Sequence, residues 1–269
     1  MILGHCHVGP PGYFVRFGGL KDQQAGTIEH LKTYLGEIGF EKAVVFAPSM
    51  TGFNGDPNAW LVEAVSGDSR FIPWLMVQSP GRESVEMMKA GLGGGVKGIK
   101  FHPPVSRMAI NDPMLEQFYR SAELSRLPIL YHTGPHGWNL EKYRPILIDR
   151  VAQRHPRLPL IIEHLGGAGF ARETYAVMQN NANCFGGLAT CLTEESTWHV
   201  PLDEIKRMIM KFGAERFIFG ADFPYNSVEE NRKALEVLKG MGLSLSDVSL
   251  IVSGNLERLM SRVGEFKLG

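Results

Sequence analysis

Eight short apolar runs in the chain alternate with longer segments in which apolar residues recur at every third or fourth position. This alternation predicts βαβ units joined into a parallel sheet. Runs such as 43–46 and 217–219 are apolar throughout, which is typical of strands covered on both faces by protein. The predicted strands are 2–7, 42–47, 71–77, 98–102, 128–132, 160–164, 183–188 and 217–222.

Amphipathic segments lie between these strands and predict helices. Asn111 and Ser227 are residue types that commonly cap a helix at its N-terminus, and each stands before such a segment. The predicted helices are 27–38, 111–124, 143–154, 202–212, 227–238 and 245–252, with a further short helix at the C-terminal end.

The ends of the predicted strands recur about every 31 residues, the length of a βαβ repeat. Eight right-handed units of this kind close into a barrel, so we predict an α/β fold, a single (β/α)8 TIM barrel that occupies residues 1–269 as one domain. An open doubly wound sheet is the competing fold, but it marks its first strand–helix turn with a glycine fingerprint. The first turn here reads His-Val-Gly-Pro-Pro-Gly, which has the wrong spacing and places proline where amide donors are needed.

Composition narrows the classes of partner. The 28 basic and 28 acidic residues give zero formal net charge, which argues against the basic surface of a nucleic-acid-binding protein. No apolar run approaches the roughly 18 residues of a membrane span. The three cysteines do not suggest a disulfide framework and the first residues do not resemble a signal peptide, so we expect a cytoplasmic protein that acts on a small molecule. The sequence leaves open whether the chain forms a homodimer.

Ionisable side chains gather at the ends of the predicted strands. In a TIM barrel the catalytic groups sit at the C-terminal ends of the strands. A metal site is therefore expected at this end of the barrel. Five of the eight strands end in such residues, which are His5 and His7, Lys100 and His102, His132, His164, and Asp222.

His5 and His7 stand two residues apart on the first strand, so their side chains should project to the same face. Two adjacent imidazoles can bind one divalent metal ion, although the pattern is weak by itself. His132 and His164 would join them at the same end of the barrel. Asp222 closes the set, because its carboxylate could bind the metal and accept a proton from metal-bound water.

Lys100 allows three interpretations. It could extend out of the barrel or pair with a carboxylate, it could be carbamylated and bridge two metal ions, or it could hold a substrate carboxylate as a cation. The last two are preferred over the first.

The loops that follow the strands should supply specificity. Arg16 in the first loop could pair with a substrate carboxylate. His102, His136 and Trp138 lie in the loops after the fourth and fifth strands, and Tyr225 follows the eighth. We predict these five residues as contacts of the substrate.

Five motifs occur in a fixed order, which is His-x-His at the first strand, then GIKFHPP, YHTG, IIEHLGG and FGADFP. This ordered set resembles the amidohydrolase superfamily, and more narrowly amidohydrolase family 2, the branch of TIM-barrel metal-dependent hydrolases that includes relatives of aminocarboxymuconate-semialdehyde decarboxylase. The resemblance implies that His5, His7, His132 and Asp222 bind a divalent metal. It also implies that His164 is either a ligand of a second metal or a residue that polarises the substrate.

The same resemblance implies a chemistry. We predict a metal-dependent hydrolase that activates water to cleave an amide, lactone or ester bond, with Asp222 and His164 as catalytic residues. The expected metal is zinc, as one ion or as two if Lys100 is carbamylated. The first alternative is a metal-dependent non-oxidative decarboxylase of an unsaturated or aromatic acid, and the second is an inactive barrel that serves as a binding module. Many relatives carry an acidic residue at or just before the first histidine, where this chain has Gly4, so other groups must orient the ligands.

Overall fold

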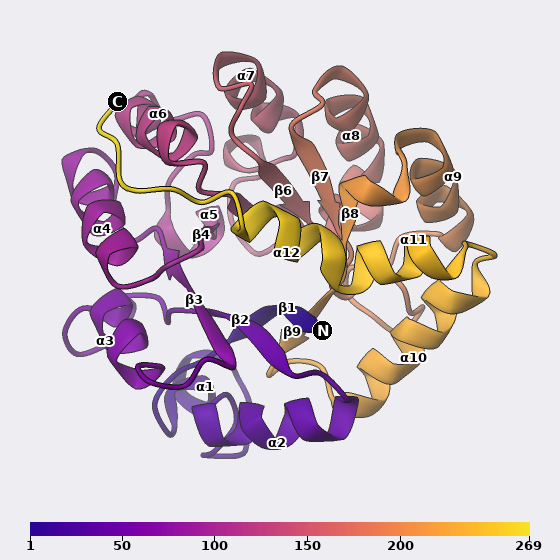
Figure 1. Cartoon of the computed structure of the whole chain (residues 1–269), viewed down its shortest axis with the longest axis horizontal. Helices are drawn as coiled ribbons and strands as arrows, with labels where there is room; N and C mark the ends of the chain where they lie inside the picture. Colours follow the sequence, from indigo (N-terminus) through magenta and orange to yellow (C-terminus); the bar gives the residue numbers. More distant parts are fainter.

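The computed structural model describes all 269 residues and folds them into a ring of parallel strands surrounded by helices (Figure 1). Every neighbouring pair in the ring is parallel, which confirms the α/β barrel. Each predicted strand end falls within one residue of an observed one. The strands are β1 (Ile2–His7), β2 (Lys42–Phe46), β3 (Phe71–Met76), β4 (Gly98–Phe101), β5 (Ile129–His132), β6 (Leu160–Glu163), β7 (Cys184–Gly187), β8 (Phe217–Ile218) and β9 (Gly220–Phe223).

The ring closes through a strand that is broken in the middle. β8 pairs with β7 and β9 pairs with β1, and only Phe219 separates the two halves. The backbone N–H of Phe219 donates to the carbonyl of Ile251 instead of to a strand. A Cβ atom on Gly4 would lie 2.5 Å from the Phe219 carbonyl oxygen, so β1 can approach this break only with glycine at that position.

Helices cover the outside of the ring, as predicted, but their bounds differ in places. Asp112 instead of Asn111 caps the turn that leads into α6, because its carboxylate accepts the N–H of Met114. Ser227 caps α10 as predicted, in a capping box with Glu230. The helices are α1 (Tyr13–Phe17), α2 (Ile28–Ile38), α3 (Pro57–Ala64), α4 (Arg82–Gly93), α5 (Pro103–Ser106), α6 (Glu116–Ser125), α7 (Ile146–Arg154), α8 (Gly167–Asn180), α9 (Leu202–Phe212), α10 (Val228–Gly240), α11 (Leu245–Ser249) and α12 (Asn255–Met260).

Two apolar cores result from this arrangement. The larger core lies between the strands and the outer helices and contains 57 buried residues. The smaller one includes side chains inside the barrel, such as Phe46 and Trp74, and continues into Leu256 and Leu259 of α12. Helix α12 lies across the centre of the ring in Figure 1 and so closes one end of the barrel. The functional side chains must therefore open at the other end.

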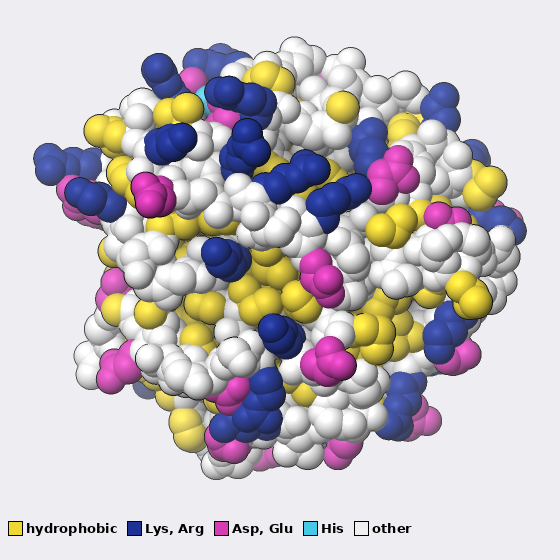
Figure 2. Space-filling view, viewed as in Figure 1, with side chains coloured by type: hydrophobic (Ala, Val, Ile, Leu, Met, Phe, Trp, Pro, Cys, Tyr) yellow, Lys and Arg dark blue, Asp and Glu magenta, His cyan; other side chains and the backbone are white.

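The face that carries α12 shows basic and acidic side chains interspersed, with apolar atoms between them (Figure 2). A field of one sign does not cover this face, which agrees with the zero formal net charge. No helix combines the length and the apolar character needed to cross a bilayer.

Candidate metal centre

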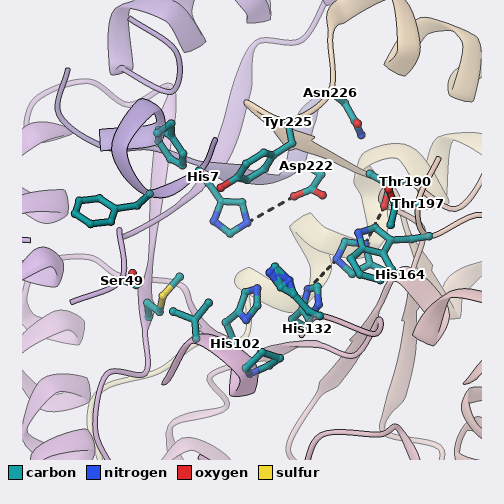
Figure 3. Close-up of a pocket in the computed structure, with 18 of the residues that line it drawn as sticks. His7, Ser49, His102, His132, His164, Thr190, Thr197, Asp222, Tyr225 and Asn226 are labelled. Atoms are coloured by element: carbon teal, nitrogen blue, oxygen red, sulfur yellow. Dashed lines mark hydrogen bonds and ion pairs between the residues drawn. The ribbon is translucent and has the colours of Figure 1, made fainter. Parts of the chain in front are cut away.

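A cavity of about 830 Å³ opens at the C-terminal ends of the strands. Five of the seven side chains predicted at the strand ends line it together, and they come from β1, β5, β9 and the segments after β4 and β6 (Figure 3). They are His7, His102, His132, His164 and Asp222. The structure therefore brings together side chains that lie more than 200 residues apart in the chain.

Strained backbone places three of the polar side chains. His5, His164 and Asp222 have φ angles of 57°, 61° and 53°, in the left-handed region that residues other than glycine rarely adopt. β1 also shifts register around His5 against both of its neighbours. His5 and His7 do converge as predicted, but a bulge is involved, not regular strand alternation. Such strain is typical of functional sites, where the surrounding structure holds it in place.

The imidazoles of β1 and the carboxylate of β9 form a compact group. His5 Nε2 lies 3.0 Å from His7 Nε2 and 3.2 Å from Asp222 Oδ1, and His7 Nε2 lies 3.6 Å from the same oxygen. Zinc–ligand bonds of about 2.0–2.1 Å in a tetrahedron place ligand atoms about 3.3 Å apart. The three separations lie on either side of that value, so the group fits a divalent ion without large movement.

His132 and His164 form a second pair whose proton positions are set by their backbone partners. His132 Nε2 lies 3.0 Å from the carbonyl of Gly134, and His164 Nδ1 lies 3.0 Å from the carbonyl of Ala189. Because a carbonyl oxygen only accepts, each of these nitrogens carries the proton. The remaining nitrogens, His132 Nδ1 and His164 Nε2, face each other at 3.2 Å with lone pairs. Two lone pairs this close call for a cation between or beside them.

Thr190 removes the alternative proton arrangement for His164. Its hydroxyl oxygen also lies 3.0 Å from His164 Nδ1, but the hydroxyl itself donates to the carbonyl of Ala189 at 2.6 Å. The hydroxyl is therefore an acceptor toward His164. Both neighbours of Nδ1 accept, so Nε2 is the unprotonated nitrogen.

Glu163 is a site residue that sequence analysis missed. It is 1% exposed, and its Oε2 lies 2.9 Å from His5 Nδ1, although the ring N–H is not well aligned with that oxygen. Its Oε1 accepts the backbone N–H groups of His164 and Ala189, both at 3.2 Å. Glu163 thus supplies the acidic partner whose absence at Gly4 the sequence had pointed out.

Lys100 is fully buried beneath the cavity. Its ammonium nitrogen lies 3.1 Å from His5 Nε2 and 5.2 Å from the centre of the Phe46 ring. Burial lowers the pKa of Lys100 to about 8, although Glu163 and Asp222 oppose this shift. The side chain does not extend out of the barrel, and two carboxylates, Glu163 and Asp222, act on its charge.

The charges in the site are strongly coupled. Burial raises the pKa of Asp222, but the neighbouring His5, His164 and His7 outweigh burial and lower it below its ordinary value. The pKa of Glu163 is also lowered, to about 2, because the effect of the neighbouring His5 outweighs the opposing effect of burial. Burial lowers the pKa of His164 to about 4 and that of His132 well below its ordinary value. Both carboxylates are therefore ionised and both histidines are neutral near neutral pH.

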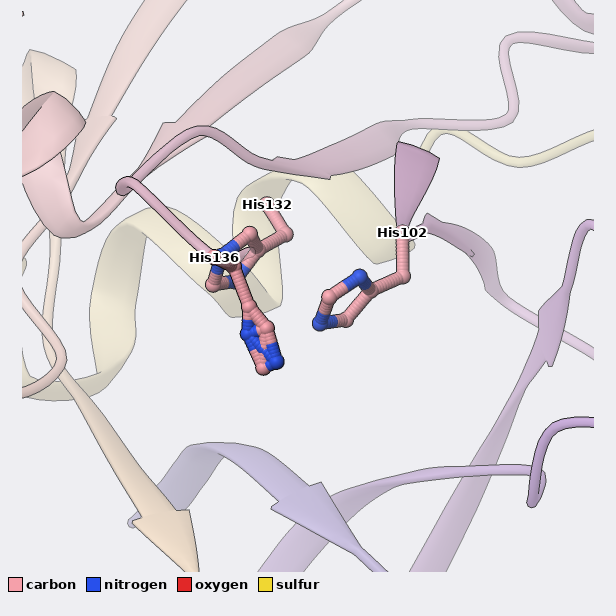
Figure 4. A group of neighbouring side chains, drawn as sticks. All are labelled: His102, His132 and His136. Atoms are coloured by element: carbon pink, nitrogen blue, oxygen red, sulfur yellow. The ribbon is translucent and has the colours of Figure 1, made fainter. Parts of the chain in front are cut away.

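Three histidines stand together nearer the mouth of the cavity, and two of them are stacked (Figure 4). The rings of His102 and His132 are 4.1 Å apart and nearly parallel, with an angle of 7° between them. His136 contacts both rings edge-on. The three offer ligand atoms within 4.8 Å of one another, while the two nitrogens of His132 are also directed to Gly134 and His164.

The predicted substrate contacts divide into two groups. His102, His136 and Tyr225 line the cavity. Arg16 is exposed and lies over the ring of Phe17, and Trp138 stacks on Tyr143, and neither is part of the lining. Their predicted contact with substrate has no support in these positions.

Two residues that sequence analysis did not consider, Arg107 and Trp198, line the cavity in place of Arg16 and Trp138. Arg107, directly after α5, is the one Lys or Arg side chain in the lining of the cavity. Trp198 packs its ring against His132 and His164, with both ring centres 5.4 Å away. A Cβ atom on Gly134 would lie 2.5 Å from the Trp198 ring, so glycine at that position makes room for it. The aromatic wall predicted for Trp138 is thus formed by Trp198.

The family model described as amidohydrolase matches residues 4–260. None of the curated proteins matches the sequence. Among solved structures, an uncharacterized TIM-barrel protein from Bordetella bronchiseptica is similar at 18% identity and a TM-score of 0.80, with 98% of this chain and 99% of that chain covered. At these identities such likeness defines the fold alone.

Two further solved structures carry functional names. One is a probable 2-pyrone-4,6-dicarboxylic acid hydrolase from Acinetobacter baumannii with citric acid bound (18% identity, TM-score 0.69, 97% of this chain and 98% of that chain covered). The other is a dihydroxybenzoic acid decarboxylase from Polaromonas with bound manganese and the inhibitor 2-nitroresorcinol (14% identity, TM-score 0.69, 97% of this chain and 96% of that chain covered).

The matched range includes all the site residues described above and every strand except the first two residues of β1. The fold defines a TIM-barrel protein with polar side chains gathered at the C-terminal ends of its strands. The chain belongs to the amidohydrolase family. Its structural neighbours include both a hydrolase and a decarboxylase, so membership of the family does not decide between these two kinds of enzyme.

Proposed function

We propose that the protein is a metal-dependent hydrolase that cleaves an amide, lactone or ester bond of a small molecule. The proposal rests on one observation. His132 Nδ1 and His164 Nε2 face each other at 3.2 Å, and each carries a lone pair instead of a proton. Such an arrangement is stable when a cation shares the two nitrogens. The imidazoles of His5 and His7 and the carboxylate of Asp222 lie on the same cavity floor.

The residues that would hold the ion are His5, His7, His132 and Asp222, with His164 toward a second ion or the substrate. A bound divalent ion supplies Lewis acidity and lowers the pKa of a coordinated water from about 15.7 toward about 7. Histidine and carboxylate ligands are compatible with zinc, which we propose, and also with manganese, the ion named for the decarboxylase neighbour.

Asp222 is the group that we propose handles the proton. One of its oxygens, Oδ1, is turned toward His5 and His7, which leaves Oδ2 to accept a proton from the attacking water. Its lowered pKa keeps it ionised and ready to accept at neutral pH. The same carboxylate then returns the proton to the leaving group. We propose His164 as the other catalytic residue, because its Nε2, which carries a lone pair, would hold a second ion that polarises the substrate carbonyl.

The wall of the cavity suggests how a substrate is held. Arg107 is exposed and has no carboxylate partner within the chain, so we propose that it pairs with an anionic group of the substrate in place of Arg16. Trp198 offers an aromatic face beside His132 and His164 for the body of the substrate.

Metal analysis combined with one variant tests the proposal. Protein prepared with metal ions available should carry at least one divalent ion per chain, and removal of the ion should abolish hydrolysis. Asp222→Asn should lower kcat by 100-fold or more, roughly the contribution of a general acid–base group. A wild-type protein without metal would favour the inactive-barrel alternative, and an active Asp222→Asn variant would exclude the proton role.

A decarboxylase remains the second candidate because of Lys100. Its ammonium group contacts His5 Nε2 at 3.1 Å, and a lysine that stays unmodified in this position would fit a centre with one ion. In that case Arg107 or Lys100 would lie near the carboxylate that is lost. Release of carbon dioxide from aromatic or unsaturated acids, measured beside hydrolysis of lactones and amides, separates the two reactions.

A further inference from the structure

The carboxylate of Glu163 is built into the protein more tightly than any of the proposed metal ligands. Its Oε1 accepts two backbone N–H groups, from His164 and from Ala189, both at 3.2 Å. Its own carbonyl accepts the hydroxyl of Thr133 at 2.7 Å. Backbone donors from the ends of β6 and β7 therefore fix the side chain, which is 1% exposed, and Thr133 from the end of β5 holds the backbone of the same residue.

The second oxygen of Glu163 has a single neighbour. Oε2 lies 2.9 Å from His5 Nδ1, and this nitrogen has no other polar partner. The chain also makes room for the carboxylate on β7, because a Cβ atom on Gly187 would lie 2.2 Å from Oε1. Glycine at this position is what allows Glu163 to occupy the space between the strands.

We propose that Glu163 is a positioning residue for His5, and that Gly187 is the residue that makes room for it. One carboxylate oxygen is fixed by the two backbone donors, so the other is presented to His5 Nδ1 and keeps the proton on that nitrogen. His5 Nε2 is then left to the ion. This inference rests on the proposed metal site and assigns a role to two residues outside the ligand set. Carboxylate partners of this kind commonly raise the affinity of a histidine for its metal.

The isosteric amide gives a sharp test, because it cannot satisfy both sides. In Glu163→Gln the amide oxygen should turn to the two backbone N–H donors of His164 and Ala189. The NH₂ group then faces His5 Nδ1, which must become an acceptor, and the proton moves to Nε2. Volume and polarity change little, so the effect is on the tautomer of His5.

Two measurements follow. Heteronuclear NMR of the metal-free protein at alkaline pH should show His5 with the proton on Nδ1 in the wild type and on Nε2 in Glu163→Gln. Chelator competition with zinc should show binding about 10–100-fold weaker in Glu163→Gln than in the wild type. Gly187→Ala keeps the carboxylate but displaces it, and should weaken zinc binding as well.

Glu123→Gln is the matched control. Glu123 is also a buried carboxylate beside a histidine, with Oε2 3.5 Å from His155 Nδ1, but it belongs to the outer helices. This variant should leave both the His5 tautomer and zinc binding unchanged. Far-UV circular dichroism shows whether each variant is folded. If Glu163→Gln does not fold, Gly187→Ala provides the test.

The outcomes separate this inference from the proposed function. Wild-type zinc affinity in folded Glu163→Gln and Gly187→Ala, with the proton still on Nδ1, overturns the positioning role. A wild-type protein that binds no ion overturns the proposed function. In that case the NMR measurement still tests the positioning role, because it shows whether Glu163 determines which nitrogen of His5 carries the proton.

Discussion

His132 Nδ1 and His164 Nε2 face each other across 3.2 Å, and each ring has its proton on the opposite nitrogen. Both rings are buried, and the lowered pKa values keep them neutral at neutral pH. A buried polar atom without a suitable partner costs about 1–3 kcal/mol of folding free energy. The metal-free protein therefore keeps a local conflict that a bound cation removes.

This relationship predicts how a variant of His164 changes the response to metal. The free energy of unfolding of the wild type should rise by about 2.7 kcal/mol when the ion is present at 100 times its Kd. His164→Gln should reduce this gain markedly, because the amide can turn its NH₂ group toward His132 Nδ1 and donate to it, which already relieves the conflict without an ion. Thermal unfolding with and without chelator measures the difference. His136→Gln, in the mouth of the cavity, is the control and should keep the full gain.

A carbamate on Lys100 is expected to couple to the number of bound ions. The pKa of about 8 leaves a fraction of the amine neutral near pH 7, and the neutral amine is the form that reacts with carbon dioxide. In bicarbonate buffer with zinc, intact mass spectrometry should show one added CO₂, and metal analysis should give two ions per chain. Lys100→Met should reduce this to one. A single ion and an unmodified wild-type chain would contradict the two-metal form and favour the decarboxylase.

Arg107 and Arg16 provide a matched pair for substrate binding. Both are exposed, but only Arg107 lines the cavity. Arg107→Met should raise KM for a carboxylate substrate by about 10–100-fold, the range expected for loss of a hydrogen bond to a charged group worth about 1.5–3 kcal/mol. Arg16→Met should leave KM unchanged. Steady-state kinetics that gave the reverse result would restore the sequence-based assignment of Arg16.

The metal-free protein should lose stability as the pH falls from about 7 to about 5. A histidine whose pKa is lowered by folding binds fewer protons in the folded state, so acid favours the unfolded chain. Folding lowers the pKa of five site histidines and raises that of only one, His5, so their summed effect destabilises the fold in acid. Urea unfolding of chelated protein should show a lower midpoint at the lower pH. An unchanged or higher midpoint would mean that these rings are protonated in the fold. The five are His7, His102, His132, His136 and His164.

The strands could be predicted closely from the sequence because each is a short apolar run buried on both faces. Five helices were not predicted, and two of them, α1 and α5, have only five and four residues. Of the longer three, α8 begins with Gly167-Ala-Gly, α4 ends among glycines, and α3 is a single short segment that begins at Pro57. Their local sequences are weak helix formers, and packing against the strands decides their conformation.

The site shows a different limit. His132 and Asp222 could be found because each ends a recognisable strand. Glu163 was missed because it directly precedes His164, and regular alternation sends adjacent residues to opposite faces. The left-handed φ of His164 breaks that alternation and lets both side chains reach the lumen. Two adjacent polar residues at the end of an apolar strand were the available signal.

Helix α12 sets the order in which a newly made chain can complete this site. Its Leu256 and Leu259 cover the inner core at the end of the barrel opposite the cavity. During synthesis all the proposed ligands, including Asp222, leave the ribosome before these leucines do. Until they follow, Phe46 and Trp74 lack part of their apolar cover. Secure capture of an ion by the nascent chain should therefore await a segment that is translated after all the proposed ligands.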